Sequence, residues 1–318
     1  MRPTRPTAVR RAEADEEAVR SGEESVRSAA HAPEYLHRKE QAENFPVALM
    51  VLPARYRVQL RHLYGVARVI DDLGDAGAPE HRTSALLAFR DDLSTIWHGG
   101  TPRSAVLRDL AETVRAGGLP EQPFVDLIEA NLRDQTTKTY ATYDDLLGYC
   151  ALSANPVGRL VLDVFRASTP ERIALSDKVC TALQIIEHCQ DVAEDHRAGR
   201  LYLPLTDLDR FGVRRADLEA LTATPAVRQL VRFEVERAEA LLADGAPLLG
   251  QLRGWARLAV AGYIAGGRAA AAALRRADFH VLPTHPARRR QDVLTALVAL
   301  WVRSAVSRRA PVRPKELM

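Results

Sequence analysis

The sequence predicts an all-α protein with one large helical domain, and three observations lead to that fold class. Alanine, leucine and arginine dominate the composition, and each favours a helix because it loses little conformational freedom there. From Tyr35 onward, apolar residues recur at three- and four-residue spacing nearly throughout. No segment alternates apolar and polar residues over the length of a strand, and no repeat of fixed period is present.

The expected helices follow from this apolar spacing and from the turn signals between them. The first is expected to begin near Pro53, because proline suits a first helical turn, and to run to about Asp72. Glycine pairs such as Gly99-Gly100 mark breaks, and Thr169 before a proline is a candidate cap for the next helix. The other expected helical stretches are 81–97, 103–116, 121–134, 143–168, 171–198, 224–248, 252–276 and 289–308.

The two ends of the chain differ from this helical body. Residues 1–34 carry almost no large apolar side chains, so we expect a disordered or loosely ordered N-terminal tail. Residues 35–283 are expected to form the folded, catalytic domain. Residues 284–318 are expected to form a basic C-terminal helix and tail, because eight arginines and lysines after 287 face only Asp292 and Glu316.

This basic helix leaves two interpretations open. Its apolar stretch 293–302 lies between groups of arginine, so it could rest on anionic lipid as an amphipathic helix. It could equally pack on the domain with its arginines in water. No apolar run approaches the roughly 18 to 20 residues that span a bilayer, and no secretory signal is present. We therefore expect a cytoplasmic protein whose contact with the inner membrane, where it has any, is peripheral.

The composition is that of an ordinary globular protein, with 47% apolar and 27% charged residues. The net charge of +3 is too small to indicate nucleic-acid binding. The three cysteines, Cys150, Cys180 and Cys189, lie in apolar helical patterns without C-x-x-C spacing. We therefore expect reduced, structural thiols.

Two clusters of acidic residues are the strongest functional signal. The first reads Asp-Asp-Leu-Gly-Asp at 71–75, at the end of the first long helix. The second lies in 184–195, which reads Gln-Ile-Ile-Glu-His-Cys-Gln-Asp-Val-Ala-Glu-Asp. Helical spacing places the members of each cluster on one face. These members are Tyr64, Arg68, Asp71 or Asp72, and Asp75 in the first, and Gln184, Glu187, Asp191 and Asp195 in the second.

Carboxylates one turn apart on a helix repel each other by a few tenths of a kcal/mol, so two such stripes indicate a cation between them. Hard oxygen ligands that leave room for phosphate oxygens suit Mg²⁺. Two facing stripes could therefore hold metal ions on one diphosphate and neutralise it as a leaving group. A solvated helix end would explain one cluster alone. Two clusters about 120 residues apart, both within apolar helices, favour the metal site.

Around these residues the sequence resembles the squalene/phytoene synthase family. The resemblance covers about 35–282 and rests on ordered strings, chiefly Y-G-V-A-R-V-I-D-D at 64–72 and Q-D-V-A-E-D-H-R-A-G-R-L-Y-L-P at 190–204. The stretch 134–150, Gly266-Gly267-Arg268 and Ala277-Asp278-Phe279 also fit the family's pattern. The resemblance implies a helical isoprenoid-synthase bundle around a central apolar cavity. It further implies Mg²⁺-dependent ionisation of a C15 or C20 prenyl diphosphate.

The resemblance also implies roles for individual residues. The metal ligands would be carboxylates, with Glu187 standing where the family usually has asparagine. The arginines would contact the diphosphate, because a guanidinium donates to two phosphate oxygens at once. Solvated cations at a helix end are the alternative for Arg197 and Arg200, and His188 is expected to pack and not to act as a base. The expected metal ligands are Asp71, Asp72, Asp75, Glu187, Asp191 and Asp195, with Tyr64 as a further catalytic residue, and the expected diphosphate contacts are Arg68, Arg197, Arg200, Tyr202, Asn44 and Gln184.

Two strings resemble one branch of the family, the hydroxysqualene synthases of bacterial hopanoid biosynthesis. Residues 43–48 read E-N-F-P-V-A, where the synthases that join two prenyl diphosphates usually have a serine-rich string. After Cys150 those synthases have a further tyrosine, whereas this chain has Ala151 and Leu152, which cannot move a proton. This branch converts presqualene diphosphate and water to hydroxysqualene and diphosphate. The chain also lacks G-x-G-x-x-G, so we expect no NADPH.

Two other functions stay open at this point. A presqualene diphosphate, squalene or phytoene synthase would join two prenyl diphosphates and would use farnesyl diphosphate as a substrate. A non-catalytic helical scaffold homologue would belong to another class of protein, and such relatives tend to lose the metal-binding aspartates that are present here.

Overall fold

The structure is a computed structural model, and it describes residues 52–282 of the 318-residue chain. These residues form helices and connecting loops, with no strand and a single isolated β-bridge between Thr139 and Leu201. The all-α class expected from the sequence is therefore confirmed. The expected N-terminal tail, the string 43–48 with Asn44, and the basic C-terminal helix lie outside the described residues.

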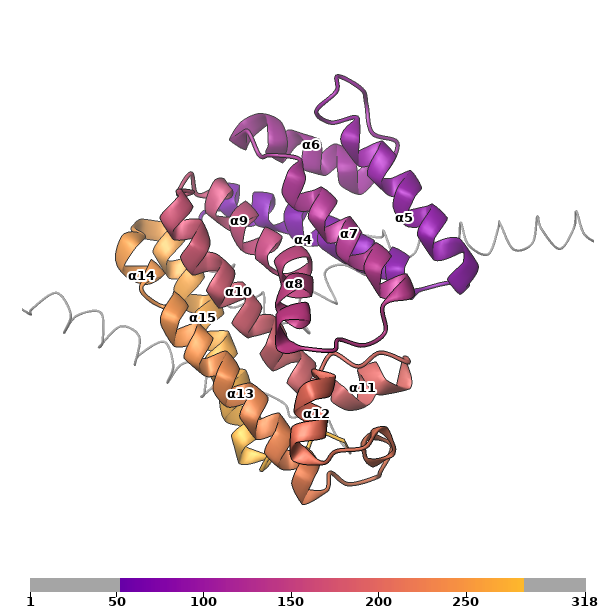
Figure 1. The fold of residues 1–318 in the computed structure, drawn as a ribbon. Coiled ribbons are helices and arrows are strands. Elements are labelled where there is room, and N and C mark those ends of the chain that lie inside the picture. Colours follow the sequence, from indigo (N-terminus) through magenta and orange to yellow (C-terminus); the bar gives the residue numbers. More distant parts are fainter. Residues whose placement is uncertain (1–51, 283–318) are drawn as a thin grey trace, which may run out of the picture.

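Most of the described helices fall into an upper and a lower group (Figure 1). The upper group is α4 (Ala54–Asp75), α5 (Pro79–Ser94), α6 (Ala105–Gly117), α7 (Gln122–Thr136) and α9 (Asn155–Val164). The lower group is α11 (Val192–Arg197), α12 (Leu205–Phe211), the 3-10 helix η1 (Arg215–Leu218) and α13 (Pro225–Gly245). Helices α10 (Pro170–Gln190) and α15 (Gly254–Arg276) run from the level of the upper group down to the lower one, and α8 (Tyr143–Ser153) and α14 (Leu248–Gln251) lie at mid-height.

Helix α4 carries the first acidic cluster and is anchored by its apolar face. Pro53 precedes the helix as its cap residue, one position before the first turn in which it was expected. Leu60, Val69 and Ile70 have no exposed surface and belong to a core that α4 shares with α5, α6, α7 and α9. This packing fixes the C-terminal end of α4, where the aspartates begin.

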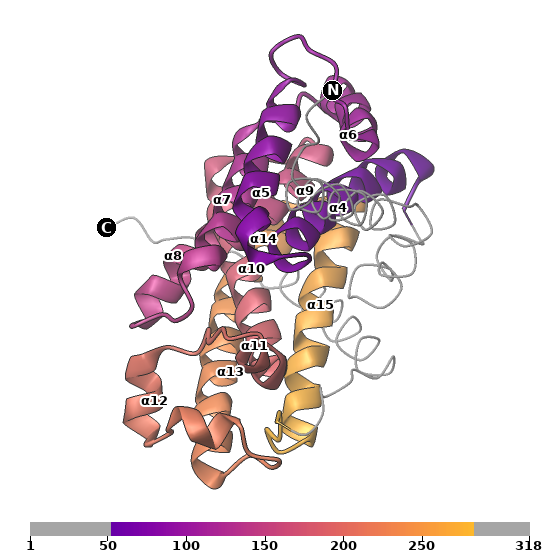
Figure 2. The same cartoon turned by 90° about the vertical axis from the view of Figure 1, so that its right-hand side faces the viewer.

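Helix α10 connects the upper and lower parts of the molecule and packs against α8, α9, α13 and α15. The long helices α10, α13 and α15 run side by side in both ribbon views (Figures 1 and 2). Thr169 caps α10, because its hydroxyl accepts a hydrogen bond from the amide of Arg172, as the sequence led us to expect. The second acidic cluster therefore lies at the C-terminal end of a well-packed helix.

Several expected helices are divided in the structure. The stretch 143–168 breaks at Ala154, because Pro156 has no amide hydrogen for a carbonyl of the preceding turn. The stretch 171–198 breaks at Asp191, whose φ of −100° and ψ of 11° are not helical. The stretch 224–248 ends at Gly245, and α14 follows separately. Helix α12 and η1 were not expected, since seven and four residues are too few to establish a periodic pattern.

All three cysteines are free, and Cys150 and Cys189 are buried. Burial raises the pKa of the Cys150 and Cys180 thiols to about 12 each, so both are uncharged and unreactive near neutral pH. The expectation of unpaired, structural thiols is therefore confirmed.

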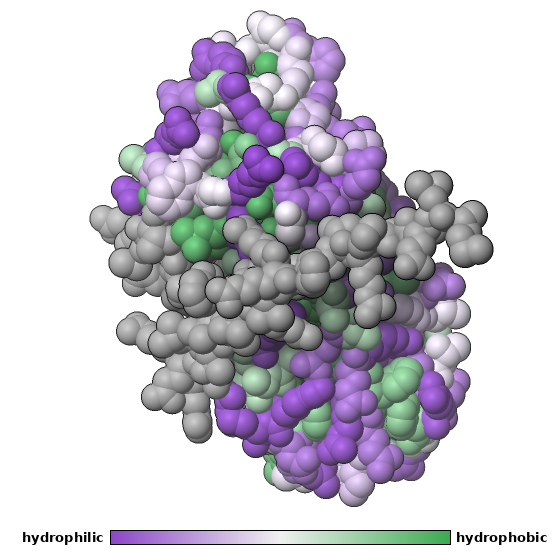
Figure 3. Space-filling model, turned by 90° about the vertical axis from the view of Figure 1, so that its left-hand side faces the viewer, coloured by the Kyte–Doolittle hydropathy of each residue, from purple (hydrophilic) through white to green (hydrophobic). Residues whose placement is uncertain are grey.

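The surface of the described part agrees with its composition. No helix between residues 52 and 282 is long and apolar enough to cross a bilayer. On the face shown in Figure 3, hydrophilic side chains predominate and hydrophobic ones gather in small separate groups. The large apolar side chains of the described chain are thus mainly in the interior.

Candidate active site

The first acidic cluster lies at the end of α4 with polar partners already in place. Arg68 Nη2 is 2.8 Å from Asp72 Oδ1, one turn further along, so these two residues share a face as expected. Asp71 Oδ1 accepts a hydrogen bond of 3.2 Å from the Asn131 amide of α7. Tyr64, one turn before Arg68, is half-buried on the same helix. The cluster therefore faces both solvent and the end of α7.

The second acidic cluster is bent at Asp191, where α10 ends and α11 begins. His188 still reaches across the bend, with its Nδ1 atom 3.6 Å from Asp195 Oδ2. Its other ring nitrogen, Nε2, lies 3.2 Å from the Gln184 amide nitrogen. His188 is buried and stacks on Tyr202 at 3.8 Å between ring centroids, so it packs as expected.

An ion pair joins the two clusters. Arg200, three residues after α11, donates a hydrogen bond of 2.6 Å from Nη1 to Asp75 Oδ1, although the two residues are 125 positions apart. The Arg200 side chain is 17% exposed and the Asp75 side chain 53%, so the ion pair is shielded from water on the Arg200 side and open to it on the Asp75 side. The structure thus places the end of α4 next to the segment that follows α11.

The carboxylates of the two clusters do not converge into a ready-made cage. Between residues 52 and 282, no group of three or more histidine, cysteine, aspartate or glutamate side chains is arranged to hold a metal ion. Guanidinium groups lie against Asp72 and Asp75 instead. The oxygen donors nevertheless fit Mg²⁺, which is held by few carboxylates together with substrate phosphates. Asp72 Oδ2 is buried and has no hydrogen-bond partner among the described residues, so it is a free oxygen donor.

Two of the expected diphosphate contacts point elsewhere in this structure. Arg197 is exposed, and its Nε donates to the Ala193 carbonyl of its own helix, as a solvated helix-end cation would. The Tyr202 hydroxyl donates to Asp134 Oδ2 at 3.1 Å inside the protein. A direct contact of either residue with a diphosphate stays a prediction.

Asp134 forms a buried hydrogen-bonded group with Tyr149 and Tyr202, and the sequence motifs did not mark it as a candidate functional residue. One of its oxygens, Oδ2, accepts hydrogen bonds from the hydroxyls of Tyr149 at 2.6 Å and Tyr202 at 3.1 Å. Burial raises the pKa of the Asp134 carboxyl, and the two hydrogen bonds and nearby Arg200 oppose this effect. The only sequence signal was the family-like stretch 134–150, because the contact with Tyr202 spans 68 positions.

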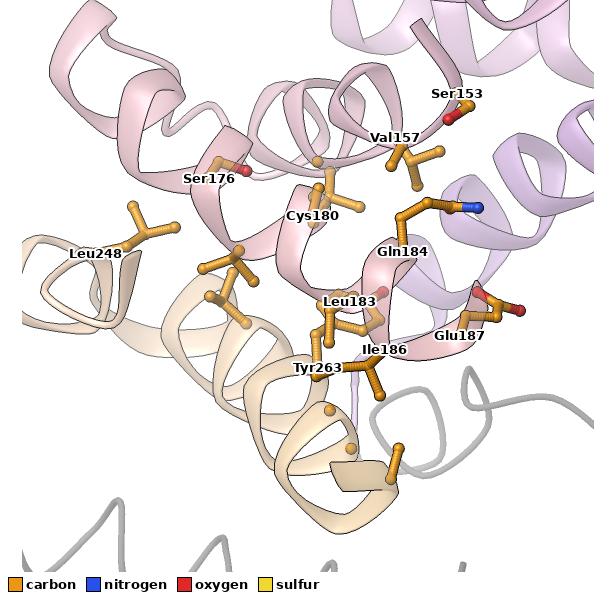
Figure 4. Close-up of a pocket in the computed structure, with 18 of the residues that line it drawn as sticks. Ser153, Val157, Ser176, Cys180, Leu183, Gln184, Ile186, Glu187, Leu248 and Tyr263 are labelled. Carbon is orange, nitrogen blue, oxygen red and sulfur yellow. The ribbon is translucent and has the colours of Figure 1, made fainter. Parts of the chain in front are cut away.

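An apolar cavity of about 250 Å³ lies between α9, α10, α14 and α15. Val161, Val179 and Leu248 contribute to its apolar wall. Gln184 and Glu187 of the second cluster also line it, and Figure 4 shows them at the end opposite Leu248. The central apolar cavity that the resemblance implied is therefore present and adjoins an acidic cluster.

Comparison with known proteins agrees with this combination of fold, cavity and acidic clusters. The sequence model of squalene/phytoene synthase matches residues 38–295. This chain belongs to the squalene/phytoene synthase family. It is accordingly an enzyme of isoprenoid biosynthesis, since its named relatives are enzymes of this family.

The similar family members include proteins with two related activities. A hydroxysqualene synthase of Rhodopseudomonas palustris is 34% identical over 212 residues, which is 66% of this chain and 72% of that protein. A presqualene diphosphate synthase of the same organism is 32% identical over 61% of this chain and 70% of that protein. Both expected branches of the family are thus represented among the relatives.

Solved structures support the same assignment. The crystal structure of squalene synthase HpnC from Alicyclobacillus acidocaldarius is 40% identical, with a TM-score of 0.69, over 77% of this chain and 94% of that chain. A dehydrosqualene synthase solved with a ligand is 21% identical, with a TM-score of 0.77, over 89% of this chain and 99% of that chain. The second comparison concerns the fold alone.

Proposed function

We propose that this enzyme ionises presqualene diphosphate and directs water to the rearranged cation, giving hydroxysqualene and diphosphate. The observation that carries this function is the junction of the apolar cavity with the second acidic cluster, through Gln184 and Glu187. A prenyl chain would occupy the cavity, and its diphosphate would lie at the polar end.

Two sets of residues around the polar end of the cavity would act in the first step, in which the C–O bond of the substrate breaks. Asp71, Asp72, Asp75, Asp191 and Asp195, with Glu187, would hold Mg²⁺, which supplies charge neutralisation as the C–O bond breaks and the electron pair leaves with diphosphate. The guanidinium groups of Arg68 and Arg200 would donate hydrogen bonds to phosphate oxygens, which stabilises the same developing charge.

The fate of the cation depends on the cavity wall near α8. Positions 151 and 152 carry alanine and leucine, and they directly precede Ser153 and Ala154, which line the cavity. No hydroxyl or base is therefore supplied at 151 or 152. A water molecule near Ser153 and Gln184 would bond to the cationic carbon and then lose a proton to solvent.

The test is incubation of the purified chain with presqualene diphosphate and Mg²⁺, without NADPH, in water enriched in ¹⁸O. Mass analysis should find hydroxysqualene carrying the heavy oxygen, and a chelator should prevent its formation. Substrate that stays intact in the presence of Mg²⁺ would refute the proposed reaction.

The second candidate is presqualene diphosphate synthase, which is favoured by the relative of that name at 32% identity. It is distinguished by incubation with farnesyl diphosphate alone. Presqualene diphosphate among the products would assign the chain to this second activity.

A further inference from the structure

We propose that Asp134 is a positioning residue, which holds Tyr202 in place and thereby holds Arg200 at the diphosphate end of the site. This inference rests on the proposed function, because Arg200 matters here as a contact for the diphosphate. Asp134 itself is only 7% exposed, and the hydrogen bond that it accepts from Tyr202 links it to the segment that carries Arg200.

The two oxygens of the Asp134 carboxylate differ in their hydrogen-bond partners. Oδ2 receives both tyrosine hydroxyls, whereas Oδ1 is buried without a hydrogen-bond partner in the described part of the chain. A buried carboxylate oxygen without a hydrogen-bond partner destabilises the fold, because its contact with water is lost and not replaced. A group kept at such a cost beside an active site is a candidate for a functional role.

The chain around Tyr202 is held from several directions. The Leu201 amide donates to the Lys138 carbonyl at 2.9 Å, and the Leu205 amide donates to the Tyr140 carbonyl at 2.9 Å. The segment after α11 therefore runs beside the linker between α7 and α8. The Tyr202 ring also stacks on His188, which contacts Asp195.

Arg200 lies two residues before Tyr202, so a fixed Tyr202 limits the positions that the Arg200 guanidinium can reach. In this structure that guanidinium meets Asp75 at 2.6 Å, at the end of the first acidic cluster. Misplacement of a positioned group by about 1 Å can cost a hundred-fold in catalysis. The hydrogen bond from Tyr202 to the buried Asp134 thus helps to fix the position of the Arg200 guanidinium at the site.

A double-mutant cycle separates positioning from a direct contact of Tyr202 with the diphosphate. The variants are Tyr202→Phe, Arg200→Gln and both together, and the readout is calorimetric binding of inorganic diphosphate with Mg²⁺. We expect Tyr202→Phe to weaken binding about ten-fold when Arg200 is present and hardly at all in the Arg200→Gln background. Equal weakening in both backgrounds would overturn the proposal.

Variants of Asp134 and of its second partner, Tyr149, complete the experiment. Asp134→Leu should weaken binding as Tyr202→Phe does, whereas Asp134→Asn keeps an acceptor oxygen and should restore most of the affinity. Tyr149→Phe serves as the comparison. It removes the Tyr149 hydroxyl from Asp134 and from its contact with Tyr202, but it leaves the Tyr202 hydroxyl bonded to Asp134, so it should weaken binding less than Tyr202→Phe does. A loss with Tyr149→Phe as large as with Tyr202→Phe would contradict positioning. A parent enzyme that binds no diphosphate would instead refute the proposed function, on which the inference rests.

Discussion

At the scale of single residues, each aspartate of the first cluster has a different neighbour. Asp71 accepts from Asn131, Asp72 pairs with Arg68 one turn away, and Asp75 pairs with Arg200 from a distant segment. These partners offset the mutual repulsion of three carboxylates within five positions. They also mean that a cation entering the site would compete with two guanidinium groups for the same oxygens.

Replacement of one ligand in each cluster tests the metal-binding role. Asp71→Asn and Asp191→Asn each remove one negative charge with almost no change of shape. We expect the rate of diphosphate release to fall at least about 100-fold in each variant, as for the loss of one group that stabilises a transition-state charge. The rate at which diphosphate is released from presqualene diphosphate is measured at saturating Mg²⁺.

Asp109→Asn is the matched control, because Asp109 is an exposed aspartate of α6 outside both clusters. It should retain the parent rate. Full activity in both Asp71→Asn and Asp191→Asn would contradict the role assigned to the clusters.

At the scale of elements, the cavity depends on how closely α9 approaches α10. A Cβ atom at Gly158 would lie 2.4 Å from Cys180 Sγ and 2.5 Å from Ser176 Oγ, far inside contact distance. Gly158→Ala should therefore lower the free energy of unfolding by about 1–3 kcal/mol, the usual cost of overpacking. Because Gly158 also lines the cavity, the same change should weaken binding of the prenyl chain.

Gly148→Ala on the neighbouring α8 is the control. Nothing lies within 4 Å of a Cβ atom at that exposed helical position. Alanine should stabilise the helix there by about 0.5–1 kcal/mol, because it loses less backbone freedom than glycine. Denaturant titrations of both variants should give shifts of opposite sign, and equal shifts would show that the α9–α10 contact is not tight.

The same scale explains what could be predicted from the sequence. Local periodicity was sufficient for the long helices and for the shared face of Arg68 and Asp72, because both depend on residues within one or two turns. Asp134 could not be found in this way, since its contact with Tyr202 depends on how α7 meets the loop after α11. Arg197 and Arg200 looked equivalent in sequence. The structure shows that Arg197 contacts its own helix, whereas Arg200 reaches Asp75 because the chain after α11 passes the end of α4.

At the scale of the whole molecule, a buried charge cluster joins α12 to α13. Arg237 Nη2 donates to Asp207 Oδ2 at 2.7 Å and to both oxygens of Glu234 at 2.6 and 2.7 Å. Arg237 also lies over the Tyr143 ring of α8, 3.6 Å from its centroid. Glu234 has no exposed surface, so the stability of the fold depends on whether its carboxyl is protonated.

Glu234 makes that stability depend on pH in a definite direction. Burial raises the pKa of Glu234 from 4.5 to about 7, with Arg237 opposing the shift. The folded chain thus holds this proton more tightly than the unfolded chain does. The contribution of Glu234 to the free energy of unfolding is complete below about pH 4.5 and is lost as the pH rises through about 7, by up to about 1.4 kcal/mol per pH unit.

Glu234→Gln should remove this dependence, because glutamine imitates the protonated carboxyl and leaves Arg237 paired with Asp207. Urea titrations between about pH 5 and 8 should show the variant gaining stability relative to the parent as the pH rises, with a plateau above about pH 7. Glu236→Gln, at an exposed position of the same helix, should leave the pH profile of the parent unchanged. If the difference between Glu234→Gln and the parent is constant across this range, the Glu234 carboxyl is already ionised in the fold and Arg237 outweighs burial.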